Sequence, residues 1–349
     1  MPRPQAENIE MNQQSSRPAP ARAAAWHRAG ARSVVILGAM LGLMAPMTAA
    51  AETRWAVIVS GASGGEKYAE QMKQWRATLQ TALVERHGFD AAHVRMLVDE
   101  TITGGTTGSA ANVKAVFSEI RKTAGSDDLV LLVLLGHGTF DGEVAKFNLV
   151  GPDLTATDWN QLLTGLPGRL IVVNTSEASF PFLEALKGKG RVVITATNSA
   201  AQKYATVFPE YFVKALSEAS TDLDKNGRTS IFEIFEAASL AVKQHYEQRG
   251  QLTTERALLD DNGDGLGKEE GAEGPDGGFA RLWQIDAEPA ALSNNPELAA
   301  LLAQRRTLEA EAEGLKQRKD AMPPAEWQAA YEKLMIDLAR VSQEIRKKS

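Results

Sequence analysis

The sequence of 349 residues contains no cysteine. This absence excludes disulfide bonds, thiolate metal sites and a cysteine nucleophile. Basic residues are also in the minority, with 38 Lys and Arg against 44 Asp and Glu and a net charge of −6. Proteins that bind nucleic acid usually carry a basic face, so this charge balance argues against a nucleic-acid partner.

Long apolar runs are missing except for Ser33–Met47 near the N-terminus. The segment before this run is basic, and Ala49 and Ala51 follow it as small residues ahead of Glu52. A basic start, a short apolar core and an Ala-x-Ala site are typical of a secretory signal peptide. The run is too short to cross a membrane comfortably, although an uncleaved anchor is the alternative. We therefore expect residues 1–51 to be a signal peptide.

Removal of that segment changes the charge of the chain. It holds five arginines and two glutamates, so the mature chain would carry a net charge of −9. We expect an acidic, exported protein, periplasmic or extracellular, with no membrane span after cleavage.

The middle of the chain alternates between strand-like and helical patterns. Leu129–Leu135 has seven apolar residues without alternation, and such a strand must be covered on both faces, as in a parallel sheet. Strands separated by helices imply βαβ units. We therefore expect an α/β fold over residues 52–288, a three-layer sandwich with a mostly parallel sheet. The expected strands are Trp55–Ser60, Val94–Val98, Leu129–Leu135, Leu170–Val173 and Val192–Thr195, and the expected helices between them are Tyr68–Arg86, Ala110–Thr123 and Thr157–Leu166.

The residues after each strand are the candidates for function, because functional groups of open α/β sheets collect beyond the carboxyl ends of the strands. The loop Gly61–Gly65 lacks the length and the lysine of a phosphate-binding loop. His137 lies between two glycines, which permit a tight turn and leave the imidazole at the sheet edge. A structural histidine is the alternative. Ser176 follows the next strand, so we expect His137 and Ser176 to face each other across adjacent strand ends.

This layout resembles the clan CD cysteine peptidases, which have the caspase-like fold, and most closely the legumain family. Four segments match in order: WAVIVSGASGGEKYAEQ, HVRMLVDE, DDLVLLVLLGHGTFDG and RLIVVNTSEASF. The resemblance implies that His137, followed by Gly138, corresponds to the general base. It places Ser176 at the position of the nucleophilic cysteine and Glu177 at the acidic residue after it. The family's turn glycine falls at Ser179 and its substrate-binding arginine at Ala69, so recognition of asparagine is in doubt.

The exchange of cysteine for serine decides the expected activity. A thiol has a pKa near 8.5, so a neighbouring histidine readily produces a thiolate. A serine hydroxyl is far less acidic and usually needs a histidine that a third, buried carboxylate orients. Asp141 or Glu177 could supply that carboxylate, which would give an active hydrolase using Ser176 and His137. The expectation that we favour is a catalytically inactive relative that binds peptides or proteins.

Two acidic loops have the pattern of calcium sites. Residues 222–233 form a twelve-residue EF-hand-type loop with glycine at position 6. Residues 260–271 repeat positions 1, 3, 5 and 6, but position 12 is Gly271, and Glu269, Glu270 or Glu273 could substitute. A helix-capping turn and a flexible surface loop are the alternatives. The expected Ca²⁺ ligands are Asp222, Asp224, Asn226, the carbonyl of Arg228 and Glu233 in the first loop, and Asp260, Asn262 and Asp264 in the second.

The C-terminal segment, residues 292–349, is expected to be a helical hairpin with a coiled-coil-like seam. Leu301, Leu308 and Leu315 repeat at seven residues, and after the prolines the spacing of apolar residues alternates between four and three. A cap on the α/β domain and a surface for oligomers or partners are equally compatible with this pattern. A third function is also compatible with the sequence as a whole: a calcium-stabilised scaffold in which the site of His137 and Ser176 is only a remnant of the peptidase site.

Overall fold

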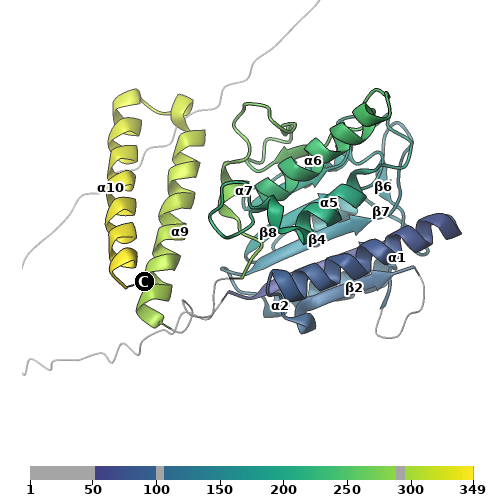
Figure 1. Ribbon diagram of the computed structural model, residues 1–349, viewed down its shortest axis with the longest axis horizontal. Helices are drawn as coiled ribbons and strands as arrows, with labels where there is room; N and C mark the ends of the chain where they lie inside the picture. The colour runs from purple at the N-terminus through teal and green to yellow at the C-terminus, as the bar shows by residue number, and fades with distance from the viewer. Residues whose placement is uncertain (1–51, 100–105, 288–294, 349) are drawn as a thin grey trace, which may run out of the picture. The chain divides into compact units, whose positions relative to one another are not determined.

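A seven-stranded sheet forms the centre of the α/β domain (Figure 1). The computed structural model describes residues 52–99, 106–287 and 295–348, which belong to a single compact unit, and the predicted signal peptide lies outside the described residues. The strand order is β10-β9-β8-β4-β1-β2-β3. All neighbouring pairs are parallel except β9 and β10. The strands are β1 (Arg54–Ser60), β2 (Val94–Val98), β3 (Thr106–Thr107), β4 (Leu129–Leu135), β8 (Arg169–Asn174), β9 (Arg191–Thr195) and β10 (Leu258–Asp260).

The apolar run of β4 is explained by its central position. Leu131 and Val133 belong to the core on one face of the sheet, whereas Leu132 and Leu134 belong to the core on the other. All seven residues of β4 are completely buried. The absence of alternation therefore reflects burial on both faces, as expected for a parallel sheet.

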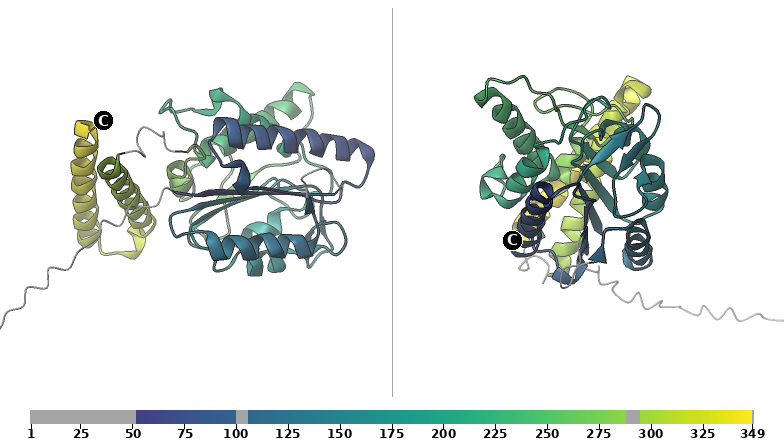
Figure 2. Two further views of the ribbon diagram at one scale, coloured as in Figure 1. Left: turned by 90° about the horizontal axis from the view of Figure 1, so that it is seen from below. Right: turned by 90° about the vertical axis from the view of Figure 1, so that its right-hand side faces the viewer.

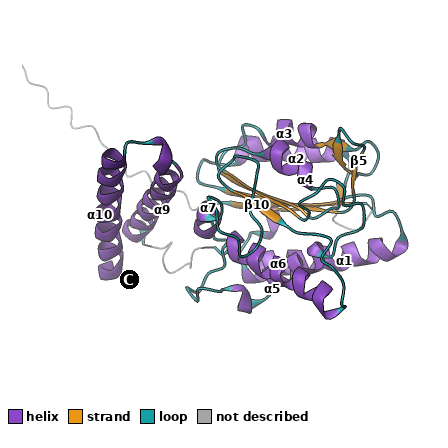
Figure 3. Ribbon diagram, turned by 90° about the horizontal axis from the view of Figure 1, so that it is seen from above, coloured by secondary structure: helices purple, strands orange, loops and turns teal. Residues whose placement is uncertain are grey.

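Helices cover both faces of the sheet, as Figures 2 and 3 show from different sides. Helices α1 (Glu66–Thr81), α5 (Phe208–Ser217) and α6 (Ile231–Gln248) lie on one face, and α2 (Ala110–Thr123), α3 (Ala156–Leu163) and α4 (Phe180–Leu186) lie on the other. The helix α2 buries Val113, Phe117 and Ile120 against the sheet. The predicted three-layer α/β sandwich is confirmed.

A second, three-stranded antiparallel sheet follows the central strand β4. It consists of β5 (Gly138–Phe140), β6 (Ala145–Phe147) and β7 (Leu154–Thr155), in that order. These short strands were not predicted from the sequence, and neither were the antiparallel strand β10 and helix α7 (Gly278–Leu282). The small sheet matters for the candidate site because its first strand begins immediately after His137.

The C-terminal segment forms the predicted helical hairpin, made of α9 (Pro296–Gln317) and α10 (Pro324–Lys348). Leu298 and Leu302 at the start of α9 pack with Val341 and Ile345 at the end of α10, as antiparallel helices require. The indole nitrogen of Trp327 donates to the carbonyl of Leu315, 2.8 Å away, and closes the turn. Among the described residues, no helix combines the length and the apolar character that crossing a membrane requires.

Candidate functional site

His137 and Ser176 emerge at the same edge of the sheet. Strands β4 and β8 are adjacent and parallel, with Leu134 opposite Asn174, and each candidate residue follows the end of its strand by two positions. Gly138 lies between the two chain segments. A Cβ at Gly138 would come within 2.4 Å of the Glu177 carbonyl oxygen and 2.7 Å of Ser176 Oγ. The close approach of the two segments therefore requires glycine at this position.

Both ring nitrogens of His137 face hydrogen-bond acceptors. Nδ1 lies 2.9 Å from the Glu177 carboxylate, and Nε2 lies 3.1 Å from the carbonyl oxygen of Ser63 in the loop after β1. The doubly protonated imidazolium satisfies both contacts, because each nitrogen then carries a proton. The hydrogen bond that His137 donates to the Glu177 carboxylate raises the pKa of His137 against the opposing effect of burial. The Tyr68 ring packs against the imidazole in a T-shaped arrangement, with ring centroids 4.7 Å apart.

Ser176 is held away from this histidine. Its side chain is completely buried, and Oγ donates to the Asn174 Oδ1 atom at 2.7 Å. The backbone N–H of Ser176 donates to the same oxygen at 3.1 Å. Within the described residues no hydrogen bond joins Ser176 to His137, so the dyad contact of a serine hydrolase is not formed. Among the described residues, the side-chain amide nitrogen of Asn174 is buried and has no hydrogen-bond partner.

The turn after Ser176 does not need a glycine at Ser179. Ser179 has right-handed helical backbone angles, and the left-handed residue of the turn is Ala178, at φ 52°. The Ser179 hydroxyl lies 3.1 Å from the Thr197 hydroxyl and accepts the Thr197 N–H, which ties the turn to the segment after β9. A serine at position 179 therefore causes no backbone strain.

The geometry also distinguishes the two acids, Asp141 and Glu177, that could contact His137. Asp141 accepts the backbone N–H groups of Glu143 and Val144, which closes the turn between β5 and β6. Glu177 is thus the acid that contacts His137.

An arginine that was not singled out from the sequence, Arg76, is buried on α1 and donates to the Ser60 hydroxyl at the end of β1. The signal for it was available, because position 76 lies on the apolar stripe of α1.

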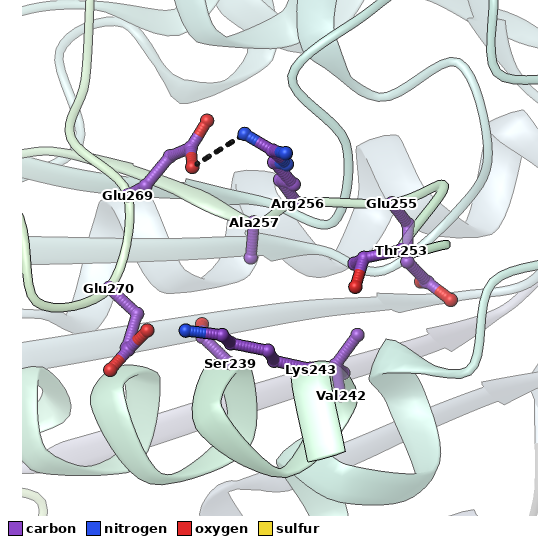
Figure 4. A pocket seen from close by; sticks show the side chains of 9 residues that line it. All are labelled: Ser239, Val242, Lys243, Thr253, Glu255, Arg256, Ala257, Glu269 and Glu270. Atoms are coloured by element: carbon purple, nitrogen blue, oxygen red, sulfur yellow. Dashed lines mark hydrogen bonds and ion pairs between the residues drawn. The ribbon is translucent and has the colours of Figure 1, made fainter. Parts of the chain in front are cut away.

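A pocket of about 240 Å³ adjoins the segment after β9 (Figure 4). Glu269 on its wall pairs with Arg256 and accepts the side-chain amide of Asn198 at 3.0 Å. Lys243 and Glu270 also line it, and no ion pair to either side chain is formed within the described residues. The contact with Asn198 links this pocket to the segment after β9, in which Thr197 forms hydrogen bonds with Ser179 in the turn after Ser176.

The loop at residues 222–233 brings together its predicted carboxylates. Oxygen atoms of Asp222, Asp224 and Glu233 lie within 4.8 Å of one another. The Asn226 N–H donates to both Asp222 and Asp224, and the Asn226 carbonyl-type side-chain oxygen accepts the Arg228 N–H. Glu233 also caps helix α6 through Ser230, one carboxylate oxygen accepting from that residue. This oxygen-rich set matches the ligand chemistry of Ca²⁺.

The loop at residues 260–271 shares most of this hydrogen-bond pattern. Asp260 accepts from Gly263 and Gly265, and the Asn262 side chain accepts the Asp264 N–H. Asp276 accepts the N–H groups of loop positions 2 and 3. In the first loop, Glu233 accepts from the same two positions.

Asp276 therefore takes the place of the acid that position 12 lacks. Glu269, one of the substitutes considered above, is directed to Asn198 and Arg256 instead. Burial, together with the neighbouring carboxylates of Asp260 and Asp261, raises the pKa of Asp276 to about 6. Sequence reasoning missed Asp276 because it lies outside the twelve-residue window.

Comparisons with known proteins give weak similarity. The sequence matches no protein-family profile and no curated protein. A solved structure from Geobacter sulfurreducens is 13% identical with a TM-score of 0.38, covering 64% of this chain and 95% of that protein. The Drosophila initiator caspase Dronc is 11% identical with a TM-score of 0.39, covering 62% of this chain and 82% of that protein.

Proposed function

We propose that the mature chain is an exported relative of legumain-like cysteine peptidases that binds a peptide or protein partner without cleaving it. The observation that carries this proposal is that Ser176 and His137 form hydrogen bonds with other residues and not with each other. The hydroxyl of Ser176 is buried against Asn174, and the two nitrogens of His137 face Glu177 and Ser63.

Catalysis by Ser176 would require the transfer of its hydroxyl proton to His137. A serine nucleophile needs a histidine nitrogen without a proton, within hydrogen-bond reach of the hydroxyl. The imidazolium of His137 has no free lone pair, and its raised pKa extends this state to higher pH. The site keeps its place at the carboxyl edge of the sheet, where a ligand can bind.

Peptide binding without turnover is the test. The full chain without residues 1–51 would be titrated with a fluorescent peptide library, and the bound peptides would be recovered and weighed. We expect saturable binding and intact peptides. Glu177→Gln is expected to weaken binding, whereas Glu143→Gln, at an exposed position in the β5–β6 turn, is the matched control. Cleaved peptides, or no binding to any library member, would contradict the proposal.

The alternative function is a serine hydrolase that uses Ser176 and His137. The contact between Glu177 and His137 favours it, because a carboxylate that orients the histidine is the third element of a serine triad. This alternative requires the Ser176 hydroxyl to leave Asn174 and reach His137. Hydrolysis that depends on both residues would establish it.

We further propose that Ca²⁺ stabilises the fold at both acidic loops. Asp222, Asp224, Asn226, the Arg228 carbonyl and Glu233 would hold one ion. Asp260, Asn262, Asp264 and Asp276 would hold the other. Support comes from the convergence of carboxylates in the first loop and from the repeated hydrogen-bond pattern in the second. A calcium-dependent rise in melting temperature, lost in Asp224→Asn, tests the first site.

A further inference from the structure

The pocket of about 240 Å³ beside the segment after β9 brings together a hydroxyl, an ammonium and a carboxylate group (Figure 4). Ser239 and Lys243 both belong to α6 and lie four residues apart, so they share one face of that helix. Glu270 belongs to the segment after β10. Figure 4 shows the side chains of Lys243 and Glu270 extending toward one another.

The other charged side chains of the pocket already have partners within the chain. The carboxylate of Glu255 accepts the Val207 N–H at 2.8 Å and the Phe208 N–H at 3.2 Å, at the start of α5. The carboxylate of Glu269 pairs with the guanidinium of Arg256, 3.5 Å away. These three side chains form the fixed walls of the pocket.

The three remaining polar side chains are not used in this way. Within residues 52–99, 106–287 and 295–348, neither Lys243 nor Glu270 forms an ion pair, with the other or with any further residue. Ser239 is only 9% exposed, and in the same part of the chain its buried hydroxyl oxygen has no hydrogen-bond partner. A buried hydroxyl without a partner costs free energy, and a ligand that pairs with it removes that cost.

We propose that this pocket binds a free α-amino acid with a small aliphatic side chain. The α-carboxylate accepts hydrogen bonds from Lys243 and Ser239, and the α-ammonium group donates to Glu270. Both charges of an α-amino acid are attached to one carbon atom, which matches a lysine and a glutamate that extend toward one another. Val242 and Ala257 are buried on the wall of the pocket and provide an apolar surface for the side chain of the ligand.

The charge and the volume of the pocket restrict the ligand further. A simple anion would be repelled by Glu270 and a simple cation by Lys243, whereas a zwitterion is attracted by both. The volume of about 240 Å³ lies below the range of about 300–1,000 Å³ that is usual for sites of drug-sized ligands. A single amino acid therefore fits the pocket better than a peptide of several residues.

Calorimetric titration of the full chain with L-valine tests the proposal. Two analogues of the same shape are titrated in parallel: isovalerate, which lacks the ammonium group, and L-valinamide, which lacks the carboxylate. We expect saturable binding of L-valine at one site. Each analogue is expected to bind at least about tenfold more weakly, because each loses one hydrogen bond between charged groups.

Variants of the pocket assign the contacts. Lys243→Met and Glu270→Gln keep the size of the side chains and remove the charges, and each is expected to weaken the binding of L-valine at least about tenfold. Ser239→Ala is expected to weaken it about two- to tenfold. The matched controls are Lys73→Met on α1 and Glu247→Gln on α6, which change exposed residues outside the pocket and are expected to alter the affinity less than about twofold.

Three results would overturn the proposal. The first is the absence of saturable heat with L-valine. The second is binding of isovalerate or L-valinamide as tight as that of L-valine. The third is a loss of affinity in the two control variants as large as that in Lys243→Met and Glu270→Gln.

Discussion

Replacing Glu177 by glutamine removes the charged partner of His137 while keeping the size of the side chain. Hydrogen bonds to charged groups contribute about 1.5–3 kcal/mol. Both side chains are largely buried, at 18% and 11% exposure, so solvent screens the pair little. We therefore expect Glu177→Gln to lower the free energy of unfolding by about 1.5–3 kcal/mol where the histidine is charged.

The pH dependence of this loss follows from the sign of the pKa shift. Glu177 raises the pKa of His137 in the folded chain. The stabilisation is thus fully present below the unfolded value of about 6.5 and is lost as the pH rises through the folded-state pKa. Urea unfolding at pH 5.5 and pH 9, with NMR titration of the His137 ring, measures both effects.

The variant Glu143→Gln serves as the control, since the side chain of Glu143 is exposed and does not contact the histidine. It is expected to leave the pKa of His137 and the stability unchanged. The reasoning is refuted if the pKa of His137 in Glu177→Gln equals that of the wild type. A stability loss of the same size at both pH values would refute it as well.

The remaining predictions concern calcium and the core. Calcium at a hundred times its dissociation constant should stabilise the fold by about 2.7 kcal/mol per site, measured by thermal unfolding with and without chelator, and Asp224→Asn should remove the contribution of the first loop. Asp276→Asn should raise the melting temperature in chelator at pH 7. The pKa of Asp276, raised from about 3.9 in the unfolded chain to about 6, means that its ionisation destabilises the fold increasingly between these two values and fully above pH 6. The same variant should lose the calcium-dependent gain of the second loop, and an unchanged gain would exclude Asp276 as a ligand. Leu132→Ala, in the centre of β4, should cost about 2–5 kcal/mol in urea unfolding, and a cost below about 1 kcal/mol would contradict burial on both faces of the sheet.

The central strands were predictable from sequence because their burial leaves a simple pattern. The strands Val94–Val98 and Leu129–Leu135 and the helix Ala110–Thr123 have the predicted bounds. The short strands β5 to β7 carry no such pattern, since two or three residues are too few for a period to appear. The antiparallel strand β10 joins the sheet through a long-range contact with β9, which local sequence does not encode.

The candidate site was predictable in its location and not in its bonding. Parallel strands place His137 and Ser176 at one edge whatever their side chains do. Sequence cannot say whether the Ser176 hydroxyl turns to His137 or to Asn174, because rotamer choices decide between them. The role of Asp276 was not predicted for another reason: its carboxylate reaches the 260–271 loop only because the chain after that loop folds back onto it.

The most direct test of the central claim is covalent labelling with a fluorophosphonate probe, which reacts with activated serines. The mature chain would be treated from pH 6 to pH 9 and analysed by peptide mass spectrometry, with Ser176→Ala as the control. The buried, Asn174-bound hydroxyl predicts no adduct at Ser176 at any of these pH values. An adduct at Ser176 that disappears in His137→Ala would show that the two residues form an active pair.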